Sequence, residues 1–280
     1  MKRVIVNADD FGLHSSINRG IVEAYLRGMV SSTSLMVCGD AFLDAVDLIQ
    51  KHQMKHVGVH LVLDEERPIL SPKNLPSLVS DQGTFYSRGR LIKRLCLRQV
   101  NLFEVENELR AQIMKALDHG IVPTHLDGHG HVHVYPYIYP IVIKLGEEFK
   151  IKRTRLPREV YSFLPKKNIL NRLFTKGLMG VFLARAEKKY RDHGFQMPDS
   201  FFGISAGGQL SIDELNRILS HMKHEGVTEI MTHPGYDSCE ISPKYKAWNY
   251  KWELELDTML AMNQIKLKSL NIEMVSFLEI

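Results

Sequence analysis

The sequence contains few cysteines, and their spacing excludes two kinds of site. Cys38, Cys96 and Cys239 lie far apart in the chain. A zinc ribbon or a redox motif needs cysteines in closely spaced pairs, and no such pair is present. Free cysteine is commonly a buried side chain, so these thiols are expected to be buried or incidental and to take no part in a reaction.

The sequence also lacks a strong excess of one charge and any long apolar run. It has 36 basic and 32 acidic residues, a net charge of +4, and this excess is too small to indicate a nucleic-acid partner. The first apolar run ends at Asn7, too early for a signal peptide. No later run approaches the roughly 20 apolar residues of a membrane span. We therefore expect a cytoplasmic protein without a membrane span.

The size and composition of the chain favour one folded unit. Its 280 residues suffice for one large α/β domain, and no linker divides them. Apolar residues make up 44% and charged residues 24% of the sequence, as in ordinary globular proteins with a filled core. We expect residues 1–280 to form a single domain.

Short apolar runs of strand type alternate with amphipathic stretches of helical length along the chain. The strand candidates are Val4–Ala8, Ser34–Val37, Val57–Val62, Ile121–Leu126, Ile151–Arg155, the residues near Phe201, Val227–Met231 and Glu273–Phe277. The helix candidates are Ile17–Leu26, Ala41–Ile49, Leu102–Leu117, Lys167–Tyr190, Ile212–Met222 and Glu253–Leu267. About eight strands in a β-then-α repeat favour a distorted or incomplete (β/α) barrel over an open doubly wound sheet.

Two long loops interrupt the alternation. Glu65–Arg90 is rich in Pro, Ser, Asp and Gly, and Asp237–Tyr250 is rich in aromatic and polar residues. Long loops inside a compact domain are usually functional or mobile. In a barrel, both are expected at the rim of the active face.

Side chains that could bind a metal follow several strand candidates. Asp9 and Asp10 end the first, and His60 lies towards the end of the third, where parallel α/β folds assemble their sites. Each residue alone has an ordinary explanation: adjacent carboxylates favour turns and helix caps, and a lone strand histidine is more often a hydrogen-bonded core residue.

The fourth strand candidate leads into an unusual cluster of histidines. Residues Thr124–His133 contain His125, His129, His131 and His133 together with Asp127. On an extended chain, the odd-numbered positions would point the same way. An incidental His-rich tract is the alternative, and the tract's place directly after a strand candidate argues against it. We expect His125, Asp127, His131 and His133 to support the metal ligands.

One more histidine, His233, closes a late strand, and Pro234-Gly235 follows it at once. Asp10, His60, His129 and His233 therefore meet at one barrel mouth. Two imidazoles and a carboxylate leave positions open on one divalent ion for water and substrate. Nitrogen ligands favour zinc, with cobalt, nickel or manganese as alternatives, over magnesium. A second carboxylate could accept the proton of the attacking water, and a histidine across the site could protonate a departing amine.

These residues together resemble the YdjC-like carbohydrate deacetylase family, which includes the chitooligosaccharide deacetylases. The resemblance covers most of the chain, and its anchors are Asn7–Gly12, Gly58–Leu61, Thr124–His133, Arg155–Glu159 and Thr232–Gly235. It implies a distorted barrel, metal ligands at Asp10, His60 and His129, Asp9 as general base and His233 as general acid. It also implies a homodimer and an N-acetylated sugar as substrate.

The sequence departs from the family pattern at a few positions. Gly128 and Gly130 stand where serine and a bulkier polar residue are frequent, and Trp252 stands where arginine is common. The last departure makes a different sugar, or a sugar on a lipid or other aglycone, a possible substrate.

Aromatic residues gather after His233 in the order Tyr236, Tyr245, Trp248, Tyr250 and Trp252. They could stack on a pyranose ring or pack in the core or an oligomer contact. Of these, Tyr236, Trp248 and Trp252 are the predicted sugar contacts. Arg155 is also a candidate substrate contact, although it and Arg158 could instead pair with acidic neighbours.

The sequence therefore predicts a metal-dependent hydrolase that removes N-acetyl groups from an amino sugar, chitooligosaccharide or related glycoconjugate. A metal-dependent phosphoesterase on a similar barrel is the alternative, since the histidine tract could hold a second ion. A non-catalytic binding protein with a metal is a further alternative, although such a protein would not need Asp9.

Overall fold

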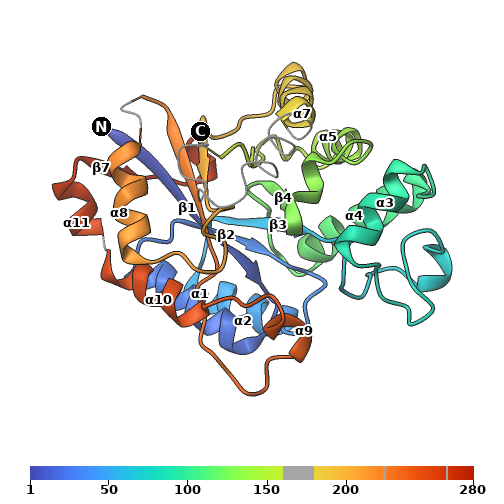
Figure 1. Cartoon of the computed structure of the whole chain (residues 1–280), viewed down its shortest axis with the longest axis horizontal. Helices are drawn as coiled ribbons and strands as arrows, with labels where there is room; N and C mark the ends of the chain where they lie inside the picture. The colour runs from blue at the N-terminus through green and yellow to red at the C-terminus, as the bar shows by residue number, and fades with distance from the viewer. Residues whose placement is uncertain (160–179, 223–224, 263) are drawn as a thin grey trace, which may run out of the picture.

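One curled parallel sheet forms the centre of the protein (Figure 1). The computed structural model describes residues 1–159, 180–222, 225–262 and 264–280. The strands are β1 (Lys2–Phe11), β2 (Ser32–Leu35), β3 (Val57–Leu61), β4 (Leu126–Gly128), β5 (Ser200–Phe202), β6 (Val227–Thr232) and β7 (Ile272–Met274). They lie in the order β4-β3-β2-β1-β6-β5, while β7 pairs with the first residues of β1, and every pair is parallel.

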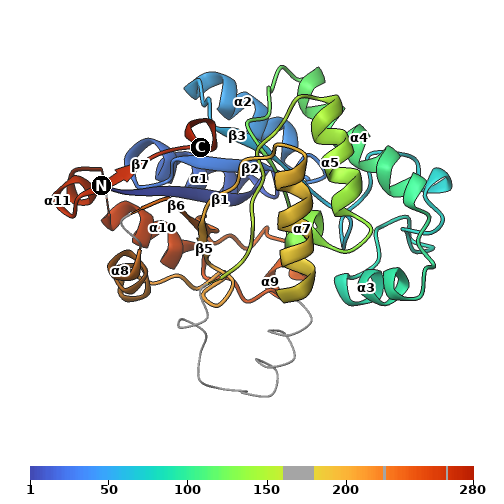
Figure 2. The same ribbon diagram turned by 90° about the horizontal axis from the view of Figure 1, so that it is seen from above.

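Helices pack around this sheet. They are α1 (Ser15–Arg27), α2 (Phe42–His52), α3 (Arg88–Cys96), α4 (Leu102–Asp118), α5 (Tyr139–Glu148), α7 (Gly180–Asp192), α8 (Ile212–His221), α9 (Pro243–Lys246), α10 (Trp252–Ala261) and α11 (Gln264–Ser269). Contacts run from α8 through α10 and α1 to α2, and from α4 through α5 to α7. Figure 2 shows α10 beside α8 and α7 beside α5. This arrangement is the predicted α/β architecture, an incomplete barrel in which one curled sheet carries an outer layer of helices.

The first βα unit shows how the sequence sets these elements. Strand β1 is buried on both faces from Val4 onward, as expected for a central strand of a parallel sheet. Helix α1 begins after His14, whose side chain accepts a hydrogen bond from the backbone N–H of Ser16. It ends before Gly28, whose N–H donates to the carbonyl of Ala24. The carboxyl end of β1 is thereby fixed between two buried neighbours, β2 and β6.

The structure corrects the predicted elements in places. Ile121–Leu126 was expected to be a strand, but β4 begins only at Leu126. Ile151–Arg155 forms only isolated bridges, Arg153 with Gln196 and Thr154 with Leu126. The helix predicted over Glu253–Leu267 is two helices, α10 and α11. Part of the helix predicted over Lys167–Tyr190 lies outside the described residues, and its described part is α7.

The predicted loops contain short helices that periodicity did not reveal. Glu65–Arg90 includes the 3-10 turn η1 (Pro72–Asn74) and the start of α3, and Asp237–Tyr250 includes α9. The extended conformation expected for the histidine tract is also wrong. After β4 the chain forms the 3-10 segment η2 (His129–Val134), in which Gly130 and His131 are left-handed, so the odd-numbered side chains do not all point one way.

Helix α1 packs against the loop after β6 through two glycines. A Cβ atom on Gly20 would lie 2.4 Å from Cα of Gly235, and one on Gly235 would lie 2.5 Å from Cδ1 of Ile17. The backbone of α1 at Gly20 is therefore in direct contact with the backbone at Gly235, two residues after His233. This close approach fixes the loop that carries the histidine to the helix that follows β1.

We expect Gly20→Ala to lower the free energy of unfolding by about 1–3 kcal/mol, because the added methyl group overpacks a backbone contact. Gly89→Ala is the matched control. Gly89 lies in the first turn of α3 with no atom within 4 Å of an added Cβ, and alanine there should be neutral or stabilising. Thermal unfolding of both variants measures the effect. An unchanged midpoint for Gly20→Ala would show that the contact is not tight.

Candidate functional site

Two adjacent carboxylates at the end of β1 both reach the inside of the sheet. Asp10 has a left-handed backbone, with φ of 65°, and the pairing with β2 shifts register between Ala8 and Phe11. This bulge cancels the alternation of an extended strand, in which neighbouring side chains face opposite ways. As a result, Asp9 and Asp10 both lie within 4.0 Å of His60.

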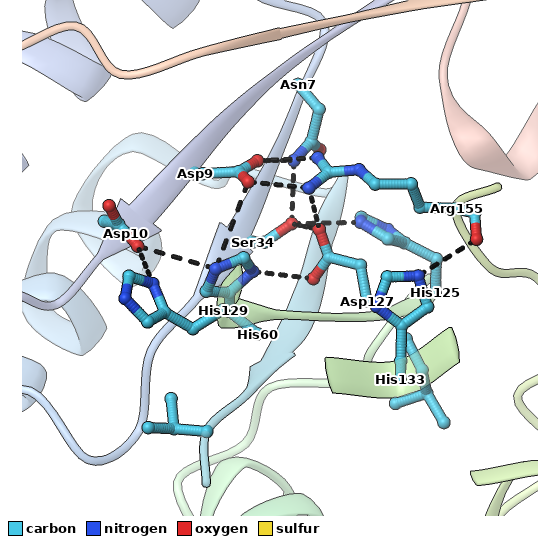
Figure 3. Close-up of polar contacts among 12 residues, drawn as sticks. Asn7, Asp9, Asp10, Ser34, His60, His125, Asp127, His129, His133 and Arg155 are labelled. Carbon is cyan, nitrogen blue, oxygen red and sulfur yellow. Dashed lines mark hydrogen bonds and ion pairs between the residues drawn. The ribbon is translucent and has the colours of Figure 1, made fainter. Parts of the chain in front are cut away.

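Asp10, His60 and His129 form a compact set of possible metal ligands (Figure 3). Their candidate ligand atoms all lie within 4.8 Å of one another. Asp10 Oδ1 is 3.1 Å from His129 Nδ1 and 3.5 Å from His60 Nε2. All three side chains are buried, and the remaining Asp10 Oδ2 and His129 Nε2 have no hydrogen-bond partner. One carboxylate and two imidazoles with unpartnered buried atoms fit a divalent cation.

Asp127 orients His60 from behind. Its Oδ1 atom lies 2.9 Å from His60 Nδ1, so this nitrogen carries the proton and Nε2 faces Asp10. Asp127 Oδ2 accepts a hydrogen bond of 2.8 Å from the Ser34 hydroxyl, which also lies 3.2 Å from His125 Nε2. The ring of His125 stacks on Phe277 at 3.7 Å. Asp127 and His125 thus lie behind the metal-binding set, where the sequence placed them.

The other two histidines of the tract have separate surroundings. His133 Nε2 lies 3.0 Å from the carbonyl oxygen of Arg155, and the His133 carbonyl accepts from the Tyr190 hydroxyl. His131 lines the cavity described below and packs edge-on against Phe201 at 5.8 Å. Neither contacts Asp10 or His60 directly in any recorded hydrogen bond of the described residues.

A buried arginine, Arg155, binds the other carboxylate at the end of β1, Asp9. Arg155 has no exposed surface, and its two terminal nitrogens each donate a hydrogen bond of 2.6 Å to Asp9. The guanidinium also lies 3.1 Å from Asp127 and donates to Glu229 at 2.7 Å. Of the two alternatives that the sequence left open for Arg155, the structure shows the pairing with acidic neighbours, and the bidentate bonds to Asp9 give the arginine a positioning role.

Arg155 also contacts a second set of residues that could bind a metal. Atoms of Asp9, His60 and Asp127 lie close enough together to hold an ion. The Arg155 guanidinium, however, is within 3.1 Å of both of these carboxylates. A permanently charged side chain is therefore already paired with both carboxylates where a second cation would have to bind.

Neighbouring opposite charges set the protonation of the possible metal ligands Asp10 and His129. Burial alone would raise the pKa of Asp10, but His129, with which it is hydrogen-bonded, and then His233 and His60 hold that pKa well below its usual range. Burial likewise opposes a charge on His129, yet Asp10 raises the pKa of its imidazole to about 9. Positive charge is thus favoured beside Asp10, which is where a cation would bind.

His233 lies across the site and is held by Glu255 of α10. Glu255 Oε2 accepts hydrogen bonds from the backbone N–H of His233 and from the Thr232 hydroxyl, and its Oε1 accepts from the N–H of Leu210. Burial alone would lower the pKa of the imidazole, but Glu255, 3.8 Å from Nδ1, raises it together with Asp10.

These groups line one cavity of about 210 Å³. Asp9, His60, His129 and His233 meet there, and Arg88 and Tyr250 enter it from the two long loops. Catalytic and ligand sites commonly combine such a concave pocket with a few convergent polar groups. The cavity is therefore the candidate active site.

The whole sequence matches known proteins. The model of the YdjC-like protein family covers residues 3–264. The chain belongs to the YdjC-like family. A carbohydrate deacetylase of Brevibacillus brevis is 34% identical over 279 residues, which is 99% of each chain. A carbohydrate deacetylase of Clostridium beijerinckii is 32% identical over 281 residues, 99% of this chain and 100% of that protein.

Solved structures share the fold of this YdjC-like protein. A candidate cellobiose-phosphate cleavage protein of Enterococcus faecalis superimposes with a TM-score of 0.76 at 24% identity, over 99% of this chain and 97% of that one. A lactam utilization protein of Thermus thermophilus gives a TM-score of 0.50 at 14% identity, over 99% of this chain and 100% of that one. At these identities the likeness concerns the fold alone.

The predicted aromatic contacts divide into two groups. Trp248 lies with its ring 5.0 Å from that of His129, so it borders the site. Trp252 is buried in the core, below Gly235, and the Tyr236 hydroxyl donates to Glu23 of α1. Tyr236 and Trp252 thus show the packing that the sequence left open as the alternative to a sugar contact, since both side chains lie on the α1 side of the loop. Tyr250, 4.6 Å from His233 between ring centres, borders the site in their place.

Three consecutive acids after β3 anchor both long loops; we call them the acidic segment (residues 64–66). Asp64 accepts a hydrogen bond of 2.8 Å from Arg88. Glu65 accepts one of 3.2 Å from Trp248 Nε1. Glu66 accepts from Lys244 at 2.7 Å and from the Tyr245 hydroxyl at 3.0 Å. The loop residues around the cavity are thus fixed to the strand that carries His60.

Sequence reasoning missed several residues that shape the site: Ser34, Asp64, Arg88, Glu229 and Glu255. All five belong to common residue types, and none lies in a motif of metal ligands. Only Glu229 had a visible signal, a charged residue in the middle of an apolar strand candidate, which indicates a buried partner.

Glu229 makes stability depend on pH. Burial raises the pKa of this carboxyl to about 7, since the opposing effect of Arg155 is smaller. In the unfolded chain the pKa is near 4.3, so the folded state loses stability as the pH rises through 7. We compare the unfolding free energies of metal-free Glu229→Gln and metal-free wild type. As the pH is raised from 5 to 8, we expect this difference to change by about 1–3 kcal/mol in favour of the variant. Urea titrations measure this difference, and one that stays constant with pH would contradict the raised pKa.

Proposed function

We propose that this YdjC-like protein is a metal-dependent hydrolase that removes the N-acetyl group of an amino sugar, a chitooligosaccharide or a related glycoconjugate. The observation that carries the proposal is the grouping of Asp10 with His60 and His129. These two imidazoles line one cavity with a separate carboxylate, Asp9, and a separate imidazole, His233. Amide hydrolysis needs a metal, a base and an acid in this relation. The names of the relatives, all carbohydrate deacetylases, support the acetylated sugar.

The proposed ligands of the one divalent ion are Asp10, His60 and His129. Their two nitrogen donors favour zinc, and cobalt, nickel, manganese and magnesium are the other candidates. When bound, such an ion acts as a Lewis acid and lowers the pKa of a coordinated water. Asp127 contributes by fixing the tautomer of His60, because a ligand imidazole is held by a partner at its other nitrogen.

Asp9 is the proposed general base. Arg155 donates to both of its oxygens, and Asn7 donates to Oδ1 at 2.8 Å. A carboxylate has about four acceptor directions, so these three bonds leave one for a water in the cavity that Asp9 lines. The same bonds keep the carboxylate oriented towards that water, which reduces the entropy lost in the reaction.

His233 is the proposed general acid. It lines the cavity with Asp9, and Glu255 and Asp10 raise the pKa of its imidazole although burial opposes this. A raised pKa favours the protonated ring, which an acid that protonates a leaving nitrogen requires. Tyr250 and Trp248 border this part of the site and offer aromatic surfaces to a pyranose ring.

The phosphoesterase alternative is disfavoured by Arg155. Two-ion phosphoesterases hold two cations a few Å apart, whereas here the carboxylates of Asp9 and Asp127 already have a guanidinium within 3.1 Å.

Among the helices that the structure describes, none has the length and apolar character needed to cross a membrane. The homodimer and the cytoplasmic location stay predictions, which light scattering and cell fractionation can test.

The reaction itself is tested by acetate release from a panel of N-acetylated mono- and disaccharides after reconstitution with zinc. We expect release that stops when a chelator is added and returns when metal is restored. The preferred sugar would then narrow the substrate. Protein with confirmed bound zinc and no release from any member of the panel would contradict the proposed reaction on simple amino sugars.

The roles of base and ligand are separated by two substitutions. We expect Asp9→Asn to retain bound metal and to lose about 10²- to 10⁴-fold in kcat, because an amide cannot accept the proton. We expect His129→Ala to lose metal content as well as activity. Asp81→Asn, an exposed loop carboxylate, is the control and should match wild type. Turnover near the wild-type rate in Asp9→Asn would reject Asp9 as the base.

A further inference from the structure

Arg88, the first residue of α3, enters the candidate active site from outside the metal-binding set. It lines the cavity together with His129, His233 and Tyr250, and its side chain is 43% exposed. Its Nε atom donates to Asp64. Among the residues that the structure describes, no hydrogen bond is recorded for its two terminal nitrogens, so both remain available at the cavity.

The place of Arg88 depends on a glycine beside a proposed metal ligand. Gly130 follows His129 and has φ of 54°. A Cβ atom at this position would lie 2.2 Å from Arg88 Nε and 2.4 Å from Cζ. The guanidinium therefore lies directly against the backbone of residue 130. Any other residue there would both strain the backbone and displace the arginine.

Asp64 fixes the guanidinium from the other side. This carboxylate is fully buried, and its Oδ1 atom has no partner. Arg88 forms a salt bridge with Asp64, and the hydrogen bond of 2.8 Å from Nε to Oδ2 orients the guanidinium plane. A side chain that is held at Nε and free at both terminal nitrogens presents a rigid pair of donors.

The charge of the surroundings indicates what these donors bind. The positive charge of Arg88 is already paired with the buried carboxylate of Asp64, so the two side chains together carry no net charge. A fixed anion on the substrate would therefore gain little here, whereas uncharged hydroxyl oxygens need only the donors.

We propose that Arg88, placed by Gly130 and Asp64, is a specificity-determining residue that donates hydrogen bonds to hydroxyl oxygens of an uncharged sugar. This inference rests on the proposed function and deepens it. Tyr250 gives the sugar an apolar surface in the same cavity, and its ring also lies over a glycine: a Cβ on Gly208 would come within 2.1 Å of it. Two left-handed glycines thus make room for a polar and an aromatic contact.

The first test compares Arg88→Lys and Arg88→Gln with wild type on N,N′-diacetylchitobiose. Loss of a charged hydrogen bond to a substrate commonly costs about tenfold or more in binding. We expect Arg88→Gln to raise KM about tenfold with kcat within about threefold, and Arg88→Lys to recover little of the loss. Arg90→Gln is the matched control, because Arg90 lies on the same helix over Tyr86. It should leave both constants unchanged.

Binding is measured separately from turnover. Trp248 borders the site, so its fluorescence should report addition of the disaccharide to the metal-free protein, and Arg88→Gln should raise the dissociation constant about as much as KM. Wild type that binds the disaccharide through Arg88 but releases no acetate would contradict the proposed function alone. Wild type that does not bind it, or Arg88→Gln with unchanged KM and dissociation constant, overturns the inference about Arg88.

Gly130→Ala tests the placement of the arginine. We expect it to raise KM like Arg88→Gln, and the double variant to be no worse than either single one, because both changes remove the same contact. Gly120→Ala introduces the same backbone strain in open space, with φ of 77°, and controls for strain. Metal content is checked in each variant. Additive effects in the double variant, or an Arg88→Gln defect confined to the 6-phosphorylated disaccharide, would overturn the proposal.

Discussion

The buried guanidinium of Arg155 is the interaction on which the rest of the site depends. It lies among carboxylates from β1, β4 and β6, and it is their shared counter-charge. Burying those acids without it would be very costly, since an unpaired charge in a protein interior is strongly destabilising. The arginine thus allows the strand ends of the sheet to converge with their acidic side chains inward. Its orientation of Asp9 follows from the same bonds that balance the charge.

A second constraint is the end of β1, where the left-handed Asp10 turns two consecutive carboxylates into one space. A regular strand would have sent one of them to the opposite face of the sheet. Because of the bulge, one carboxylate faces the imidazoles of His60 and His129 while its neighbour faces Arg155. Residues in sparsely populated backbone regions tend to occur at functional sites, and here the unusual backbone separates the proposed ligand Asp10 from the proposed base Asp9.

The sequence was a good guide to what lies at strand ends and a poor guide to what lies between them. The alternating pattern predicted the incomplete barrel, and the family resemblance named Asp10, His60 and His129, which the fold brings together. The sequence left two alternatives open for Arg155 and Trp252, because a residue type does not reveal whether a side chain faces substrate or core. Ser34, Asp64 and Glu255 lie on other elements than their partners, and such long-range pairing leaves no local pattern in one sequence.

The acidic segment has a consequence for how this fold can change. The strand that carries His60 also holds, through three neighbouring carboxylates, the loop residues that border the cavity. Between those anchor points, exposed positions such as Lys73 and Asp81 can change without disturbing the bonds to the acidic segment. New sugars could therefore be accommodated by loop exchange between fixed attachment points, while the catalytic geometry stays with the sheet. The attachment points themselves would be the last positions to tolerate replacement.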